Sequence, residues 1–129
     1  MTETIVPIAI TANTAVSALG SGLADHLGAL TGRRRGLRAN DFTSEPLECA
    51  IGRVDGLESA GLPDEFAVYE CRNNRLAWMG LNADGFIDVA RAAIARHGAD
   101  RVALLVATST SSIGATEEGY LSQQDGEMP

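Results

Sequence analysis

The sequence predicts an α/β fold, because segments with the pattern of strands alternate along the chain with segments that have the pattern of helices. The clearest strand is residues 102–107 (VALLVA), a continuous apolar run that suits a central strand covered on both faces. The clearest helix runs from Leu76 to Ile94, where apolar residues recur at spacings of three and four. A length of 129 residues fits one domain or a large piece of one.

Two more strands are predicted upstream of the central one. Ile5 to Ile10 is short and rich in isoleucine and valine, which predicts a buried strand that leaves into a loop. Leu47 to Val54 alternates apolar and polar residues, as a strand with one covered face does. Within it, Cys49 is interpreted as a small core residue rather than a reactive thiol.

A first helix is predicted after Ser21, which can cap it, and its apolar stripe is formed by Leu23, Leu27 and Leu30. Gly32 is expected to end it. A second helix start is predicted at residues 62–65 (LPDE), where a proline precedes acidic residues.

Two glycines interrupt the long helical pattern, and a third follows it. Gly80 and Gly85 are expected to weaken or divide the helix, because glycine is a poor helix former. Gly98, after His97, is expected to end it.

Composition narrows the class of protein. A hydrophobic fraction of 45% with 21% charged residues is typical of a globular chain. The net charge of −7 argues against a nucleic-acid surface, where binding depends on neutralising phosphates. No apolar stretch is long enough to span a bilayer, and the first residues lack the basic region of a secretion signal. These observations predict a bacterial-type cytoplasmic protein without nucleic-acid or membrane partners.

Metal and cofactor motifs are not found in the sequence. Cys49 and Cys71 fit neither a disulfide scaffold nor a zinc site, and His26 and His97 have no partners at metal-ligand spacing. No glycine-rich phosphate-binding motif occurs. We therefore predict no metal and no cofactor.

The run Arg33-Arg34-Arg35 is the strongest local charge feature of this acidic chain. It suggests a docking point for an acidic partner. The alternative, which we favour, is a solvated loop between glycines in which cations lie just beyond a helix C-terminus.

A hydroxyl-rich segment, residues 108–114 (TSTSSIG), follows the predicted central strand directly. In open α/β sheets, ligands bind at the carboxyl ends of strands, so this segment is the first candidate site. The structural alternative is a turn followed by the N-cap of a helix, since serine and threonine favour both.

Several segments together resemble β-ketoacyl-acyl-carrier-protein synthases, in particular the group associated with aryl-polyene pathways. Residues 101–120 (RVALLVATSTSSIGATEEGY) resemble the family's third core strand and loop. The other segments that resemble the family are Ile8 to Leu19 with Gly20 (first strand and turn), Gly32 with Gly36-Leu37 (glycine turn), Gly52-Arg53-Val54 (second strand) and Cys71 to Ala77 (start of a long helix).

The resemblance implies the N-terminal portion of a thiolase-like fold, part of one βαβαβ core half. It implies a fatty-acid or polyene acyltransferase that condenses an acyl thioester with malonyl-carrier protein by decarboxylation. The matched positions of the acyl-tunnel wall are Thr108, Ser109, Thr110, Ser111 and Ile113; Ser112 stands where the family commonly has glycine. The matched glycines Gly20, Gly32, Gly36 and Gly114 are interpreted as positions that need unusual dihedrals.

The catalytic residues that the family uses are not found among these residues. A condensation needs a thiolate nucleophile and donors that stabilise the developing charges, which the family supplies with a cysteine and two histidines beyond this loop. Cys49 and Cys71 lie in other elements and have no histidine in a local motif, so we reject both as nucleophiles. We predict no catalytic residue within residues 1–129, and no condensing activity of this chain alone.

The resemblance further implies an acyl carrier protein as partner, and a homodimer or a heterodimer with a related synthase. Asp64 and Glu65 stand where many family members carry basic residues that hold the carrier protein, which puts that docking surface in doubt. Two alternatives stay open: a non-catalytic subunit like a chain-length factor, and a stand-alone small α/β binding domain.

Overall fold

The structure, a computed structural model, describes residues 8–42, 47–108 and 113–124. These residues form helices and two small antiparallel sheets, so the chain is mixed α/β, as predicted at this coarse level. Each sheet has two strands, β1 with β2 and β3 with β4. The predicted βαβαβ arrangement with a central strand is not present among the described residues.

The first sheet is a tight hairpin that leads directly into a helix. Strand β1 (Val16–Ser17) pairs with β2 (Gly20–Ser21), and helix α1 (Leu23–Thr31) follows after Gly22. The predicted cap is corrected by one residue: Gly22, not Ser21, is the N-cap of α1. Gly32 is the C-cap of α1, as predicted, and its backbone N–H donates to the Gly28 carbonyl oxygen at 3.0 Å.

The second sheet is also a hairpin, and the strand predicted from Leu47 to Val54 is shorter in the structure. Strand β3 (Leu37–Ala39) pairs with β4 (Ala50–Gly52). The prediction that Cys49 is a core residue is wrong, because Cys49 is exposed. It lies just before β4.

The predicted long helix is divided at Gly85, as expected, and Gly80 lies inside a helix. A 3₁₀ helix η1 (Asp64–Tyr69) is followed by α2 (Arg72–Asn82), a single 3₁₀ turn η2 (Ala83–Gly85) and α3 (Phe86–His97). The division lies at two consecutive left-handed residues, Asp84 (φ 53°) and Gly85 (φ 68°). A left-handed residue cannot continue a right-handed helix, so the axis changes direction there.

Residues 102–108 differ most from the prediction. They follow the 3₁₀ turn η3 (Ala99–Arg101) and precede α4 (Ile113–Gln124), but they form no strand. Leu105 is 88% exposed and Val106 is 65% exposed, so the apolar run is uncovered. A strand needs a hydrogen-bonded neighbour, and none of the described strands lies beside this segment.

The predicted first strand, Ile5 to Ile10, is also not formed where the structure describes it. Ile8 and Ile10 are 91% and 87% exposed and belong to no strand. Residues 5–7 lie outside the described residues.

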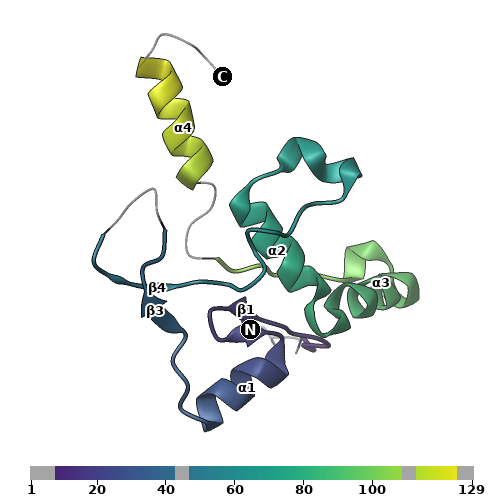
Figure 1. Cartoon of the computed structure of the whole chain (residues 1–129). Helices are drawn as coiled ribbons and strands as arrows, with labels where there is room; N and C mark the ends of the chain where they lie inside the picture. Colours follow the sequence, from purple (N-terminus) through teal and green to yellow (C-terminus); the bar gives the residue numbers. More distant parts are fainter. Residues whose placement is uncertain (1–7, 43–46, 109–112, 125–129) are drawn as a thin grey trace, which may run out of the picture.

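In Figure 1, α2 lies between the β3–β4 hairpin on one side and α3 on the other, while α4 lies at one end.

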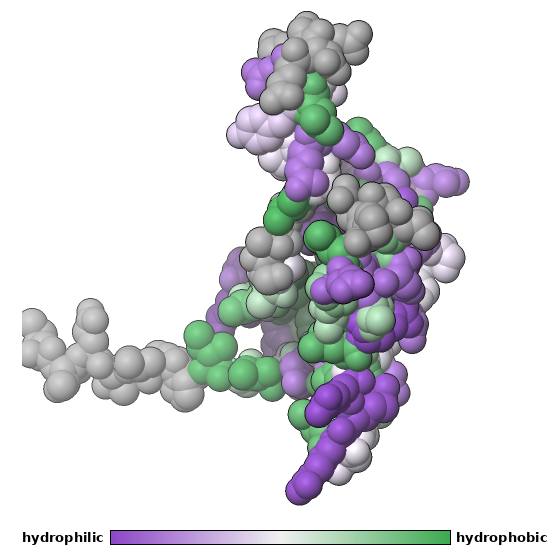
Figure 2. All heavy atoms as spheres, turned by 60° about the vertical axis from the view of Figure 1, so that its left-hand side comes forward, coloured by the Kyte–Doolittle hydropathy of each residue, from purple (hydrophilic) through white to green (hydrophobic). Residues whose placement is uncertain are grey.

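Little apolar surface is covered. Among the described residues, the buried hydrophobic side chains are Ala29, Leu57 and Ala83. The chain exposes 10609 Å², whereas a compact monomer of 13.5 kDa exposes roughly 6,500 Å². Figure 2 shows apolar residues at the surface in patches that alternate with hydrophilic residues. Even the predicted apolar stripe of α1 is exposed at Leu27 (64%) and Leu30 (69%).

Candidate functional site

The structure describes only part of the predicted tunnel-wall loop. Thr108 ends the uncovered extended segment and is exposed, and Ile113 begins α4 with 51% of its surface exposed. Ser109, Thr110 and Ser111 lie outside the described residues. The described part of this loop therefore forms no enclosed site.

The other segments that resemble the synthase family meet around the β1–β2 hairpin. A Cβ on Gly36 would lie 3.0 Å from the Ala18 carbonyl carbon and oxygen, a tight contact that favours glycine there. A Cβ on Gly52 would lie 3.2 Å from the Ala18 side chain. Helix α2 also packs beside β1. Segments separated in sequence thus converge on Ala18.

The interpretation of the matched glycines is correct for Gly20 and wrong for the others. Gly20 has φ 141°. Gly32 has φ −80°, and Gly36 and Gly114 are not among the positive-φ residues. Gly36 lies in close approach to Ala18, and Gly114 lies in α4 with open space around it.

The turn places Ser17 against His26. The Ser17 Oγ and His26 Nε2 atoms are 2.8 Å apart, and His26 Nδ1 is 2.7 Å from the Gly22 carbonyl oxygen. A carbonyl oxygen only accepts, so Nδ1–H donates to it; a neutral ring then accepts from the Ser17 hydroxyl through Nε2. The backbone N–H of Leu19 donates to Ser17 Oγ at 3.1 Å. Both side chains are half-buried.

Sequence reasoning missed this pair because it considered His26 only as a metal ligand. The available signal was the Gly20 turn, which reverses the chain between Ser17 and His26.

A second polar group joins the hairpin to the α2–α3 junction. The Asp84 Oδ2 atom accepts hydrogen bonds from the Leu23 backbone N–H at 2.9 Å and from Thr14 Oγ1 at 2.8 Å. Helix α1 has no capping side chain of its own, so Asp84 supplies the acceptor from a distant segment. Gly22 must be glycine here, since it has φ 87° and its Cβ would lie 2.5 Å from Asp84 Oδ1.

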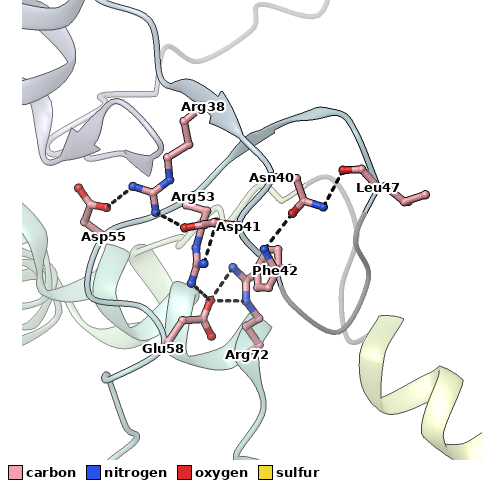
Figure 3. A network of polar contacts seen from close by, with 9 residues as sticks. All are labelled: Arg38, Asn40, Asp41, Phe42, Leu47, Arg53, Asp55, Glu58 and Arg72. Atoms are coloured by element: carbon pink, nitrogen blue, oxygen red, sulfur yellow. Dashed lines mark hydrogen bonds and ion pairs between the residues drawn. The ribbon is translucent and has the colours of Figure 1, made fainter.

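A network of alternating charges lies beside the β3–β4 hairpin (Figure 3). Arg53 is its centre: Nη1 donates to Asp41 Oδ1 at 2.9 Å, and Nη2 lies 3.6 Å from Glu58 Oε1. The Arg53 guanidinium also lies 4.4 Å from the centroid of the Phe42 ring. Arg72 continues the network, donating to Glu58 Oε1 at 3.0 Å.

This network is structural rather than an anion site. An open cleft of about 340 Å³ borders it, lined in part by Arg38, Arg53, Asp55 and Glu58. Each of the two arginines faces a carboxylate, so the cleft presents no surplus positive charge. The hydrogen bond from Arg53 holds the pKa of Asp41 below its ordinary value of 3.8.

The arginine run carries one structural contact. Arg34 Nη2 donates to the Leu19 carbonyl oxygen at 2.7 Å and so ties the end of α1 to the hairpin. Arg33 and Arg35 are exposed. The solvated-loop interpretation therefore describes Arg33 and Arg35, while Arg34 has a local role.

Within the ranges described above, no group of three or more histidine, cysteine, aspartate or glutamate side chains is placed to hold a metal ion. In the same ranges, no helix has the length and apolar character needed to cross a membrane.

Comparisons with protein-family models, with curated protein sequences and with solved structures find no match for this chain. The resemblance to β-ketoacyl synthases thus stays a prediction that depends on the motifs themselves and on how they are arranged.

Proposed function

We propose that this chain is the N-terminal portion of a thiolase-fold β-ketoacyl-acyl-carrier-protein synthase. The complete enzyme condenses an acyl thioester with malonyl-carrier protein by decarboxylation, in fatty-acid or polyene biosynthesis. In this proposal the chain contributes framework and one wall of the acyl site. The nucleophilic cysteine and the histidines belong to a later part of the protein.

The convergence on Ala18 is the observation that carries the proposal. Motif matches along a sequence arise by chance one at a time, but unrelated matches have no reason to pack together. Here Gly36 and Gly52, from two matched segments, both approach Ala18 in a third. Close approach of the Ala18 backbone to Gly36, and of the Ala18 side chain to Gly52, is a physical reason for glycine at both positions.

The uncovered apolar surface also favours the proposal over a stand-alone binding domain. Leu104, Leu105 and Val106 are 55%, 88% and 65% exposed, and the total surface far exceeds that of a compact monomer. Such surface in a folded protein is normally covered by further chain or by a partner subunit.

The division of chemistry follows from the residues present. Thr108, Ser109, Thr110, Ser111 and Ile113 line the acyl tunnel in this proposal, and Cys49 and Cys71 take no part in catalysis. No cofactor is required, because thiolate attack and stabilisation of the enolate need only side chains and backbone donors. The partners are an acyl carrier protein and a second synthase-like subunit.

The test is to tag the protein at its N-terminus at its own chromosomal locus, purify it and incubate it with a radiolabelled acyl-carrier protein. We expect a purified species larger than 13.5 kDa that carries the acyl group on a cysteine other than Cys49 or Cys71. An unlabelled tagged protein that copurifies with a labelled synthase would instead identify the chain-length-factor role. A species of 13.5 kDa without label or labelled partner would contradict the proposal.

A further inference from the structure

We propose that Ser17 and His26 form a nucleophilic dyad that accepts an acyl group from an activated ester or thioester. The proposal does not depend on the proposed function, because both residues and their contacts belong to the described hairpin and helix α1.

The arrangement has the features that activate a serine. Activation needs a base within hydrogen-bonding distance of the hydroxyl and a further group that fixes the orientation of the base. His26 Nε2 lies 2.8 Å from Ser17 Oγ, and the Gly22 carbonyl oxygen holds His26 Nδ1 at 2.7 Å. The carbonyl fixes the tautomer as the carboxylate of a catalytic triad does, without its charge.

The contact from Leu19 completes the arrangement. Its backbone N–H donates to Ser17 Oγ at 3.1 Å, which favours a partial negative charge on that oxygen as the proton leaves. The same contact occupies a lone pair of the oxygen, so we expect reaction with activated acyl donors rather than with ordinary esters.

Apolar residues adjoin the base on its helix. Leu23 and Leu30 stand three residues before and four residues after His26, spacings that place all three on one face of α1. Leu23 is 41% exposed and Leu30 is 69% exposed, so both can contact the hydrocarbon part of an acyl group. This favours acyl donors over polar ones.

The step is balanced as follows. Ser17 Oγ attacks the acyl carbonyl carbon, a C–O bond forms, and the hydroxyl proton moves to His26 Nε2. The tetrahedral intermediate then expels the thiolate or alcoholate, which takes the proton from His26 Nε2 and leaves as thiol or alcohol. The product is an acyl ester of Ser17 and a neutral His26.

The protein, purified in the form in which it occurs in the cell, is incubated with p-nitrophenyl acetate at pH 8, and the adduct is located by intact mass and peptide mapping. We expect acetyl-Ser17, which peptide mapping distinguishes from any acetylation of the exposed Cys49 thiol. Ser17→Ala should abolish acetylation at position 17, and His26→Gln should slow acetylation of Ser17 about 100-fold, the scale of general-base catalysis. The matched control is Ser21→Ala in the same hairpin, which should react like the wild type.

An unmodified Ser17, or modification at the same rate in His26→Gln, would overturn the dyad. If either substitution prevents folding of the hairpin, an alkyl fluorophosphonate applied to the wild-type chain gives a second measurement. Phosphonylation mapped to Ser17 supports the dyad, and labelling that leaves Ser17 unmodified contradicts it.

Discussion

The Asp84 carboxylate caps helix α1 from the junction of two other helices, with Oδ2 2.9 Å from the Leu23 backbone nitrogen. Asp84 itself has a left-handed conformation, with φ 53°. Aspartate tolerates that conformation better than most residues with a side chain. The same residue therefore divides α2 from α3 and fixes the start of α1.

Removing this acceptor should loosen α1. Asp84→Gly keeps the left-handed backbone accessible while removing the acceptor, and we expect a loss of about 1 kcal/mol in the free energy of local opening, the usual cost of losing a helix cap. Asp84→Ala should cost more, since alanine resists positive φ. Amide hydrogen exchange in α1 measures both effects.

The control for Asp84 is Asp88→Ala. Asp88 lies in the first turn of α3, has an 80% exposed side chain and makes only a loose pair with Arg91 at 3.9 Å. The Asp88→Ala substitution should change the protection of α1 amides from hydrogen exchange very little. Equal protection of α1 in Asp84→Gly and in the wild type would show that the distant cap contributes nothing.

Glycine at position 36 is favoured by the close approach of Ala18. Gly36→Ala places a methyl group 3.0 Å from the Ala18 carbonyl, and we expect a destabilisation of the two hairpins by about 1–3 kcal/mol from overpacking. Gly61→Ala is the matched control, because nothing lies within 4 Å of a Cβ at Gly61. Hydrogen exchange in β1 to β4 compares the variants. If hydrogen exchange in Gly36→Ala equals that of the wild type, close approach to Ala18 does not explain why Gly36 matches the synthase family.

The pKa of Asp41 should depend on Arg53. Donation from Arg53 holds this pKa below its ordinary value of 3.8, so the folded state binds protons more weakly than the unfolded state. The stabilisation is present above the ordinary value and is lost as the pH falls through the lowered one. Carboxyl carbon chemical shifts, followed by NMR from pH 6 to pH 2, measure the titration directly.

Arg53→Gln should bring the Asp41 titration back toward 3.8. Arg91→Gln, at an exposed position outside this network, should leave it unchanged. If Asp41 titrates at its ordinary value in the wild type, the hydrogen bond in Figure 3 does not persist in solution.

Thr110 should limit acyl length if it lines the tunnel. In the complete protein, Thr110→Phe should reduce kcat/KM for long acyl primers by roughly tenfold to 100-fold, the effect of about 1–3 kcal/mol of overpacking, and leave short primers nearly unaffected. The measurement compares both primers together with Tm. An equal loss for both primers with a lowered Tm would mean that Thr110 only completes a turn.

Local signals in the sequence predicted the helices better than the strands. The stop at Gly32, the division at Gly85 and the stop at Gly98 all depend on contacts within a few residues, which a sequence contains directly. A predicted strand at residues 102–107 needs a neighbour that the pattern cannot name. Its apolar side chains are uncovered because no described strand supplies that neighbour.

The polar contacts at the hairpin were beyond sequence reasoning for a related reason. Asp84 and Leu23 are 61 residues apart, and no periodicity links an aspartate at a helix junction to a distant helix start. Ser17 and His26 are closer, but their approach depends on the turn that follows Ser17. The spacing of residues along a helix or strand predicts which side chains share a face. A contact between side chains on either side of a turn can be predicted only when the backbone geometry of that turn is known.

Sedimentation velocity of the isolated 129-residue chain, with a thermal melt, tests most directly whether this is part of a larger fold. Because so much apolar surface is uncovered, we predict concentration-dependent self-association or a broad, non-cooperative melt. A monodisperse monomer of 13.5 kDa that melts cooperatively at every concentration would contradict this account and favour a stand-alone domain.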